Sequence, residues 1–343
     1  MQRKIFQNQY LMTLNNYTDG PPTTVDITIF INFFGKLDEI NMEYHMDIFL
    51  RQMWYDDRMR YRGATGPITF VGSTIDAIWK PDTFFPNAKH AEIHGGLSPN
   101  RLLKGFPNGT VLYTVRLSMA LQCEMNLAAY PMDTQTCDLT LSSFSYDESD
   151  VTLEWSKVNA VVLSRNMSLP QFTLQNYGTD KCVDNHLIGE FSCMRVTFNL
   201  RRTFGYYLLQ IYMPTAFVVI LSWVSFWINK DAVPARISLG VTTVLTMTTQ
   251  LSSSTANAPK VSYAKALDIW MTTCMAFVFA AIIHYAFVNA LSRRKPTPPA
   301  QQNNDAVEVN DDLTKKLDRI ARYIFPASFL VFNIGYWATY MPY

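Results

Sequence analysis

Two patterns of apolar and polar residues divide this chain into two halves. In the first half, short runs alternate between apolar and polar positions, which is typical of β-strands with one buried face. The clearest runs are residues 25–29, 44–49, 151–155 and 194–200. Turn-forming residues such as those at 107–110 separate the runs, so the region from 23 to about 203 is predicted to be an antiparallel, immunoglobulin-like β-sandwich. We expect the stretch before Tyr17 to be helical.

The second half contains four long apolar segments. They cover residues 206–228, 235–255, 266–291 and 320–340. A helix of about 20 apolar residues crosses the roughly 30 Å hydrocarbon core of a bilayer. The pattern therefore predicts a β-sandwich domain at residues 1–204 and a four-helix transmembrane domain at 205–343.

Basic residues gather between the third and fourth apolar segments. They are Arg293, Arg294, Lys295, Lys315 and Lys316. Because Lys and Arg concentrate in cytoplasmic connections, this linker, at about 292–316, is predicted to be cytoplasmic and both chain ends extracellular. Its composition up to about residue 312 predicts disorder, and from Leu313 the pattern is helical.

The second apolar segment is too polar to face lipid on every side. On a helix, five of its residues step by 4, 3, 4 and 3 and share one face: Ser238, Thr242, Leu245, Thr249 and Ser252. The opposite face offers Leu239, Val244, Met247 and Leu251 for packing. One interpretation is that the hydroxyls bond back to their own helix and face neighbouring helices. The other is that several copies surround an aqueous pore, with a ring of Leu245 side chains as a dewetting gate.

The residues at the start of this helix indicate whether such a pore would select anions or cations. The entrance residues Pro234, Ala235 and Arg236 include no carboxylate, and the nearest is Asp231. A cation pore is expected to carry an acidic ring there. A basic ring at Arg236 and positive helix N-termini favour anions instead.

The five cysteines favour an oxidised first half. Cys123 with Cys137 and Cys182 with Cys193 are plausible local disulfides, and Cys274 lies in an apolar run. Metal binding or free thiols are the alternatives, and no histidine stands at ligand spacing from either pair. Glycosylation sequons occur at Asn16, Asn108 and Asn166, all before the first apolar segment. MQRKIFQNQY lacks the apolar core of a signal peptide, so we expect the chain to begin at a mature or trimmed terminus.

Neither composition nor motifs indicate an enzyme. The net charge of +1 gives no reason to expect nucleic acid as a partner. His90 and His94 flank Glu92 without a third convergent ligand, and no nucleophile with an adjacent base is found. We therefore predict no catalytic site, no metal and no cofactor. A β-sandwich tethered to the membrane for recognition, without channel activity, is an alternative.

Several motifs together resemble the Cys-loop pentameric ligand-gated ion channels. They are the loop between Cys123 and Cys137 with its YPMD core, ILSWVSFWI in the first apolar segment and PARISLGVTTVLTMTTQ in the second. The resemblance is strongest to the anion-selective branch, near glycine receptor alpha subunits and glutamate-gated chloride channels, supported by IWKPDTFF, LPQF and PKVSYAKALDIW. It implies a homo- or hetero-pentamer in the plasma membrane, a postsynaptic setting, contact with lipids and chloride conduction.

The resemblance also implies an agonist site between neighbouring subunits, for an amino acid or an amine. One face of the site would present Phe84, Phe144, Tyr146, His186 and Phe191. The other would present Phe49, Arg51, Leu112, Thr114 and Arg116. An arginine can hold a carboxylate bidentately and aromatic rings can surround an ammonium. Without the resemblance, an aromatic residue on a sandwich strand usually belongs to the core.

Some positions depart from the family pattern. Ser142 replaces a glutamate, His186 a tyrosine and Ile188 a threonine, which argues against glycine as an effective agonist and keeps open a silent or modulatory subunit. Thr255 and Ala256 stand where glycine receptors carry a basic residue, and His284 replaces a common glutamate.

The resemblance implies a coupling region that transmits agonist binding to the pore. Its residues would be Asp133, Arg202 and the link from Lys260 to Tyr263.

Overall fold

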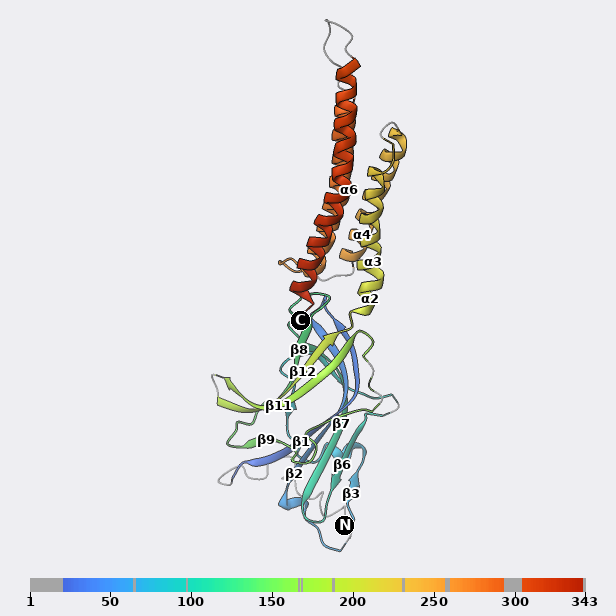
Figure 1. Cartoon of the computed structure of the whole chain (residues 1–343). Coiled ribbons are helices and arrows are strands. Elements are labelled where there is room, and N and C mark those ends of the chain that lie inside the picture. The colour runs from blue at the N-terminus through green and yellow to red at the C-terminus, as the bar shows by residue number, and fades with distance from the viewer. Residues whose placement is uncertain are drawn as a thin grey trace. The chain divides into compact units, whose positions relative to one another are not determined.

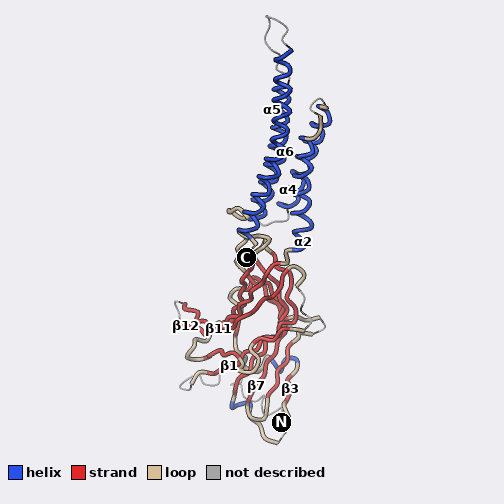
Figure 2. The backbone as a smooth tube through the Cα atoms, in the orientation of Figure 1, coloured by secondary structure: helices blue, strands red, loops and turns tan. Residues whose placement is uncertain are grey.

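The computed structural model describes residues 21–341 except 64–65, 97, 166, 168, 187–188, 230–231, 257–259 and 293–303; of residues 185–186 and 304–312 it describes the backbone alone. Two compact units are present. One comprises Met1–Met125 with Gln135–Arg201, and the other comprises Asn126–Thr134 with Arg202–Tyr343. Strands make up the first unit and helices dominate the second (Figures 1 and 2). The predicted helix before Tyr17 lies outside the described residues.

The strands form two sheets. The larger has eight strands: β1 (Thr23–Asp38), β2 (Glu43–Tyr55), β3 (Ile68–Phe70), β5 (Ala88–Ile93), β6 (Arg101–Gly105), β7 (Thr110–Gln122), β9 (Val151–Trp155) and β10 (Val161–Leu163). The smaller has the order β11 (Phe172–His186), β12 (Gly189–Arg202), β8 (Thr134–Ser143) and β4 (Thr83–Phe84). Short 3₁₀ turns lie at Asp57–Met59 and Gly72–Ile75. The predicted β-sandwich is confirmed, although β9 and β10 pair with β1 in parallel.

Alternation along the strands builds the core of this unit. Every second residue of β1 from Val25 to Ile31 has no exposed surface, while the residues between them are partly exposed. Burying one such aliphatic side chain stabilises the fold by about 1.5–3 kcal/mol. The alternation of apolar and polar residues in the sequence therefore correctly predicts which face of β1 is buried.

Both predicted disulfides are present. Cys123 bonds to Cys137 and Cys182 bonds to Cys193, while Cys274 is free and buried. No group of three or more metal-ligating side chains occurs among the residues that the structure describes.

All four apolar segments are helical. The first comprises α2 (Gly205–Tyr207), a π-helical turn at Leu208–Tyr212, α3 (Met213–Trp223) and a 3₁₀ turn at Val224–Phe226. The others are α4 (Val233–Ala256), α5 (Ala266–Ser292) and α6 (Asn304–Tyr340). By length and composition, Gly205–Phe226 and Ala266–Ser292 qualify as membrane spans among the described helices. Helix α4 is not one of these two, because its serine and threonine residues make it less hydropathic, as expected for a helix with one polar face.

Helix α6 corrects one expectation. Residues 292–312 were expected to be disordered, but α6 begins at Asn304, so the last part of that stretch is helical. Extending an existing helix costs far less than starting one, so the helix of the apolar segment continues into its polar flank. Residues 293–303, including Arg293, Arg294 and Lys295, lie outside the described part of the chain.

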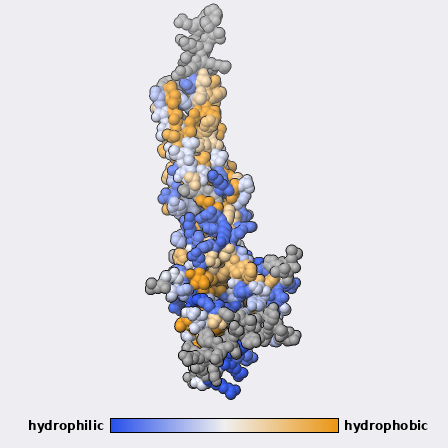
Figure 3. Space-filling view, turned by 180° about the vertical axis from the view of Figure 1, so that it is seen from behind, coloured by the Kyte–Doolittle hydropathy of each residue, from blue (hydrophilic) through white to orange (hydrophobic). Residues whose placement is uncertain are grey.

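Aromatic residues hold α3, α5 and α6 together. Trp270 on α5 lies 5.0 Å from the Tyr212 ring and 5.2 Å from the Tyr336 ring, measured between centroids. Its indole Nε1 donates to Thr215 Oγ1 at 2.9 Å. These helices also carry many exposed apolar side chains, among them Phe217, Phe279 and Leu330, and much of the helical unit is orange on the face seen in Figure 3. Such a surface is suited to hydrocarbon rather than water.

Candidate functional site

Strands β2 and β7 bring five predicted binding residues onto one face. In the antiparallel register Phe49 is opposite Arg116, and Arg51 is opposite Thr114. Leu112 lies two residues before Thr114 on β7, and side chains two residues apart on a strand share one face. These side chains are exposed or half-buried, whereas the intervening Leu50, Tyr113 and Val115 are buried. The strand geometry therefore presents the set outward.

The two arginines of this face differ in their partners. Arg116 Nε donates to Asp47 Oδ1 at 3.0 Å and Oδ2 at 3.1 Å, and its guanidinium lies 5.6 Å from the Phe49 ring centroid. Hydrogen bonding to Asp47 raises the pKa of Arg116. Arg51 is exposed and has no ion pair or side-chain hydrogen bond within the described residues. The Arg51 guanidinium is thus exposed without a partner among the described residues, whereas the Arg116 guanidinium is already paired with Asp47.

Three further predicted residues come from β4 and the turn after β8. The rings of Phe84 and Phe144 meet edge to face at 5.4 Å, and Phe144 is 67 % exposed. The hydroxyl of Tyr146 accepts a hydrogen bond from Trp79 Nε1 at 3.2 Å. Phe84 and Phe144 thus form an aromatic pair in which the Phe144 ring is accessible. The hydrogen bond from Trp79 helps to fix the orientation of Tyr146.

Two residues that the sequence predictions omitted position this aromatic turn. Asp82 accepts hydrogen bonds from the backbone N–H of Ser145 at 2.6 Å and from Ser143 Oγ at 3.2 Å. Trp79 holds Tyr146 as described above and also stacks edge to face on Trp54 at 5.6 Å. Both lie in the IWKPDTFF segment, and their hydrogen-bond partners in the turn after β8 are more than 60 residues away along the chain.

Two residues near the second disulfide are buried, and one of them had been predicted to line the ligand site. Phe191 was expected to line the ligand site, but it is only 5 % exposed and lies two residues before the buried Cys193. An aromatic ring beside a buried disulfide gains more free energy from packing than from facing water. Ser142 is also buried, with its hydroxyl 3.4 Å from the Ser192 carbonyl, so it does not face a ligand. The His186 and Ile188 side chains lie outside the described residues.

Helix α4 has one exposed and one buried face. The five residues of the predicted stripe are all exposed, as are Pro234 and Ala235. The buried face consists of Arg236, Gly240, Thr243 and Met247, with Leu239, Val244 and Leu251 half-buried. The interpretation that the hydroxyls bond back to their own helix and face neighbouring helices holds only in part. Thr242 donates to the Ser238 carbonyl at 2.7 Å and Thr249 to the Thr246 carbonyl at 2.8 Å, yet both side chains are exposed in the subunit.

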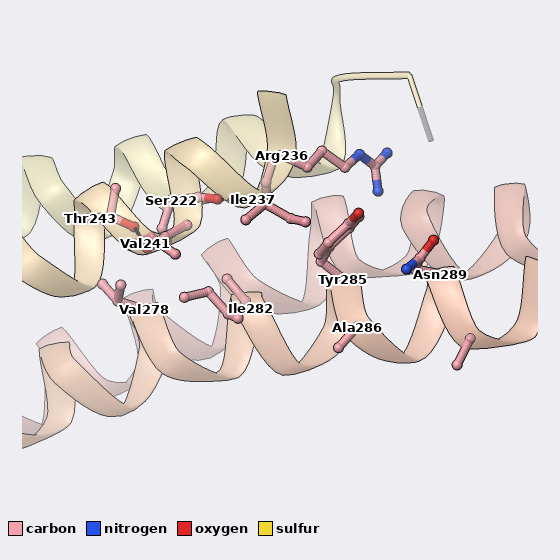
Figure 4. A pocket seen from close by; sticks show the side chains of 14 residues that line it. Ser222, Arg236, Ile237, Val241, Thr243, Val278, Ile282, Tyr285, Ala286 and Asn289 are labelled. Atoms are coloured by element: carbon pink, nitrogen blue, oxygen red, sulfur yellow. Dashed lines mark hydrogen bonds between the residues drawn. The ribbon is translucent and has the colours of Figure 1, made fainter. Parts of the chain in front are cut away.

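The expectation of a basic ring at Arg236 is wrong. Arg236 is 3 % exposed, and its Nη2 donates to Asp318 Oδ2 on α6 at 2.8 Å. Its Nε donates to the Ile228 carbonyl at 3.0 Å. His284 Nε2 on α5 lies 3.2 Å from the other Asp318 oxygen. The guanidinium is on the α4 face that packs on α5 (Figure 4), so its charge is neutralised inside the subunit instead of facing the exposed stripe.

Two of the four predicted coupling residues pair directly in the helical unit, and a third bonds to the 126–134 segment that carries one of them. Arg202 Nε donates to Asp133 Oδ1 at 2.8 Å and Nη2 to Oδ2 at 3.1 Å, and their side chains are 0 % and 2 % exposed. The Tyr263 hydroxyl accepts from the Leu127 N–H at 2.9 Å. The start of α5 is tied to the same loop, since Leu267 N–H donates to the Tyr130 carbonyl at 3.1 Å.

Other predicted positions are exposed. Lys260, Thr255 and Ala256 all lie at the surface. Asn108 is exposed in a tight turn where its Oδ1 accepts from the Thr110 N–H at 3.1 Å, which leaves its amide nitrogen accessible. Asn16 and Asn166 lie outside the described residues.

Comparison with protein families agrees with this division into strands and helices. Residues 1–204 match the neurotransmitter-gated ion-channel ligand binding domain, and residues 211–303 match the neurotransmitter-gated ion-channel transmembrane region. Members of this family form pentamers and bind small-molecule neurotransmitters. The family comprises ligand-gated ion channels and not enzymes. The two matches together cover most of the chain, which is therefore an integral membrane protein of the neurotransmitter-gated ion-channel family.

Proposed function

We propose that this chain is a subunit of a pentameric chloride channel that opens when an amino acid or amine agonist binds between neighbouring extracellular domains. The observation that carries the proposal is the exposed stripe of α4, where serine and threonine residues one turn apart leave a polar face without a packing partner in the subunit. Five such faces around an axis would line a water-filled pore, and the exposed Leu245 would form its dewetting gate. In this arrangement both chain ends are extracellular, and the 292–316 linker is cytoplasmic.

Chloride selectivity is supported by what α4 offers to an ion. From Val233 to Ala256 the helix contains no acidic residue. The positive charge of Arg236 is balanced by Asp318, so the argument does not depend on a basic ring. The remaining attraction for anions comes from the helix N-terminus, which carries a partial positive charge of about half an elementary charge.

The agonist class is supported by the two candidate faces. Arg51 is exposed and can grip a carboxylate, and the exposed Phe144 ring beside Phe84 can contact an ammonium or an apolar group. Ser142 is buried and provides no negative charge for an agonist amine. The arginine is therefore the principal polar contact of the proposed agonist.

Voltage clamp tests the proposal directly. The chain is expressed alone and exposed to amino acids, biogenic amines and protons, and the reversal potential of any evoked current is measured in chloride and in sodium gradients. We expect the reversal potential to follow chloride. A current that follows sodium would exclude anion selectivity. A current that needs a second subunit would instead indicate a modulatory subunit.

Arg51→Lys is expected to raise the half-maximal agonist concentration about 10- to 100-fold without changing the maximal current per channel at the surface. The lysine keeps the charge but loses the bidentate geometry, and a hydrogen bond between charged groups contributes about 1.5–3 kcal/mol. Arg195→Lys is the matched control, because Arg195 is also an exposed arginine on a strand. Equal agonist sensitivity of the two variants would remove Arg51 from the site.

A further inference from the structure

A cavity of about 390 Å³ lies in the β-sandwich unit, between the last part of β1 and the segment that enters β11. Residues 33–37 form one side and residues 169–172 the other. The predicted agonist-binding residues that the structure describes do not line it. Small-molecule pockets have volumes of about 300–1,000 Å³. The cavity is therefore large enough for a compact ligand and is distinct from the proposed agonist site.

The β1 strand is irregular where it forms this wall. Its register with β2 shifts between Ile31 and Phe33 and again between Phe34 and Leu37. Such bulges bend a strand and change the direction of its side chains. Odd-numbered residues of β1 are buried up to Ile31, but Phe33 is 55 % exposed and Phe34 is 1 % exposed. The first shift therefore places the Phe33 ring at the accessible edge of the cavity, where an apolar ligand can cover it.

The inner wall of the cavity is apolar and well fixed. Phe34 and Phe172 are 1 % and 3 % exposed. The Phe34 ring packs against Tyr44 at 5.3 Å and Phe198 at 5.6 Å, measured between ring centroids. A wall that is already ordered loses little conformational entropy when a ligand binds. Together with the accessible Phe33 ring, this wall favours a flat aromatic group, since aromatic pairs gain free energy beyond the area that they bury.

The charge at the rim restricts the ligand further. Lys36 is the charged residue of the lining, is exposed, and has no ion pair or side-chain hydrogen bond within the described residues. Asp38, two residues on, does not line the cavity and accepts from the N–H groups of Ile40 and Asn41 at 3.0 and 3.1 Å. The exposed Gln171 adds an amide that can donate to an oxygen. The rim therefore attracts a carboxylate and repels an ammonium.

We propose that this cavity binds a small aromatic carboxylate, with its ring against Phe33 and Phe34 and its carboxylate held by Lys36 and Gln171. The ring removes the exposed surface of Phe33 from water, which is favourable. The carboxylate stays at the open rim beside a cation, so its charge is not buried without a counter-ion. The site depends neither on the ion selectivity of the channel nor on the identity of its agonist.

Photolabelling of the assembled full chain in detergent tests this site. The probe is para-benzoylbenzoate, and the comparison probe is para-methylbenzophenone, which has the same ring system without the charge. Peptides that contain residues 33–37 and 169–172 are quantified by mass spectrometry, with and without excess para-phenylbenzoate. We expect the carboxylate probe to label both segments in a way that the competitor prevents. Absence of this protected labelling from the assembled protein would overturn the proposal, because a neighbouring subunit would then cover the cavity or no ligand would fit it.

Lys36→Gln removes the charge and keeps much of the side-chain length. Protected labelling by the carboxylate probe is expected to fall about two- to fivefold, as for the loss of an ion pair near the surface, with labelling by the uncharged probe unchanged. Lys157→Gln, at another exposed lysine of the same unit, is the matched control and should alter neither probe. An unchanged signal from the carboxylate probe in Lys36→Gln, or an equal fall for both probes, would overturn the proposal.

Phe33→Ala removes the accessible ring. Labelling by both probes is expected to fall about three- to tenfold, since each loses an aromatic contact. Thermal stability is expected to change little, because the Phe33 side chain is more than half exposed. Val158→Ala, at an apolar residue that is 84 % exposed, is the control. Unchanged labelling in Phe33→Ala would contradict the proposal, and should this variant lose stability, the exposed Lys36→Gln substitution decides alone.

Discussion

Replacing Arg202 with alanine is expected to destabilise the helical unit by about 3–5 kcal/mol, because it leaves the Asp133 carboxylate buried without its counter-ion. The two side chains have almost no exposed surface, and two hydrogen bonds of 2.8 and 3.1 Å join them. The guanidinium also lies 4.6 Å from the Tyr130 ring centroid, so the ring loses a contact as well. Since a whole domain is stable by only about 5–15 kcal/mol, the loss is large.

The measurement is the fraction of assembled protein that survives heating in detergent, followed by size-exclusion chromatography. Arg201→Ala is the matched control, because Arg201 is the adjacent residue and is exposed. The double variant Asp133→Ala/Arg202→Ala should be less destabilised than the sum of the single variants, since neither charge is then left alone. Strict additivity, or equal survival of Arg202→Ala and Arg201→Ala, would contradict the importance of this pair.

Replacing Asp318 with alanine is expected to destabilise the transmembrane helices by a comparable amount, about 3–5 kcal/mol, because Arg236 then keeps its charge in a buried position without an anion. Asp318 contacts α4 through Arg236 and α5 through His284, so a single carboxylate connects three helices. The remaining bond from Arg236 to the Ile228 carbonyl does not neutralise the charge. We expect less assembled protein at the cell surface and a lower temperature of disassembly.

Three variants separate this interpretation from a general sensitivity of the helices. Asp268→Ala removes a carboxylate that is 37 % exposed, paired with Lys265 at 3.8 Å and bonded to the Lys265 N–H at 3.2 Å, and it should cost only the roughly 0.5–2 kcal/mol of a helix cap. His284→Gln keeps a hydrogen-bond donor toward Asp318 and should cost less than Asp318→Ala. Combining Asp318→Leu with Arg236→Met removes both charges and should recover much of the stability. If the double variant is no better than Asp318→Ala, the charge pair is not the cause.

The strands and helices were predictable because each depends on a local period. The alternation at 25–29 and 151–155 reflects burial of one strand face, and the four apolar segments reflect a sustained lack of polar groups. The exposed stripe of α4 was likewise predictable, since steps of four and three residues place side chains on one helix face. The two cysteine pairs were close in sequence, and both form disulfides.

Tertiary structure decided which of these residues meet a partner. Sequence spacing placed Arg236 at the start of α4, but only the packing of α4 on α5 turns it inward to Asp318 of α6, 82 residues away. In the same way, burial rather than residue type sets the roles of Phe191 and Ser142, and long-range contacts bring Asp82 and Trp79 to the aromatic turn. The physical reason is that a local period specifies which face an element presents. The free energy of burying a charge or a ring depends on neighbours supplied by distant parts of the chain.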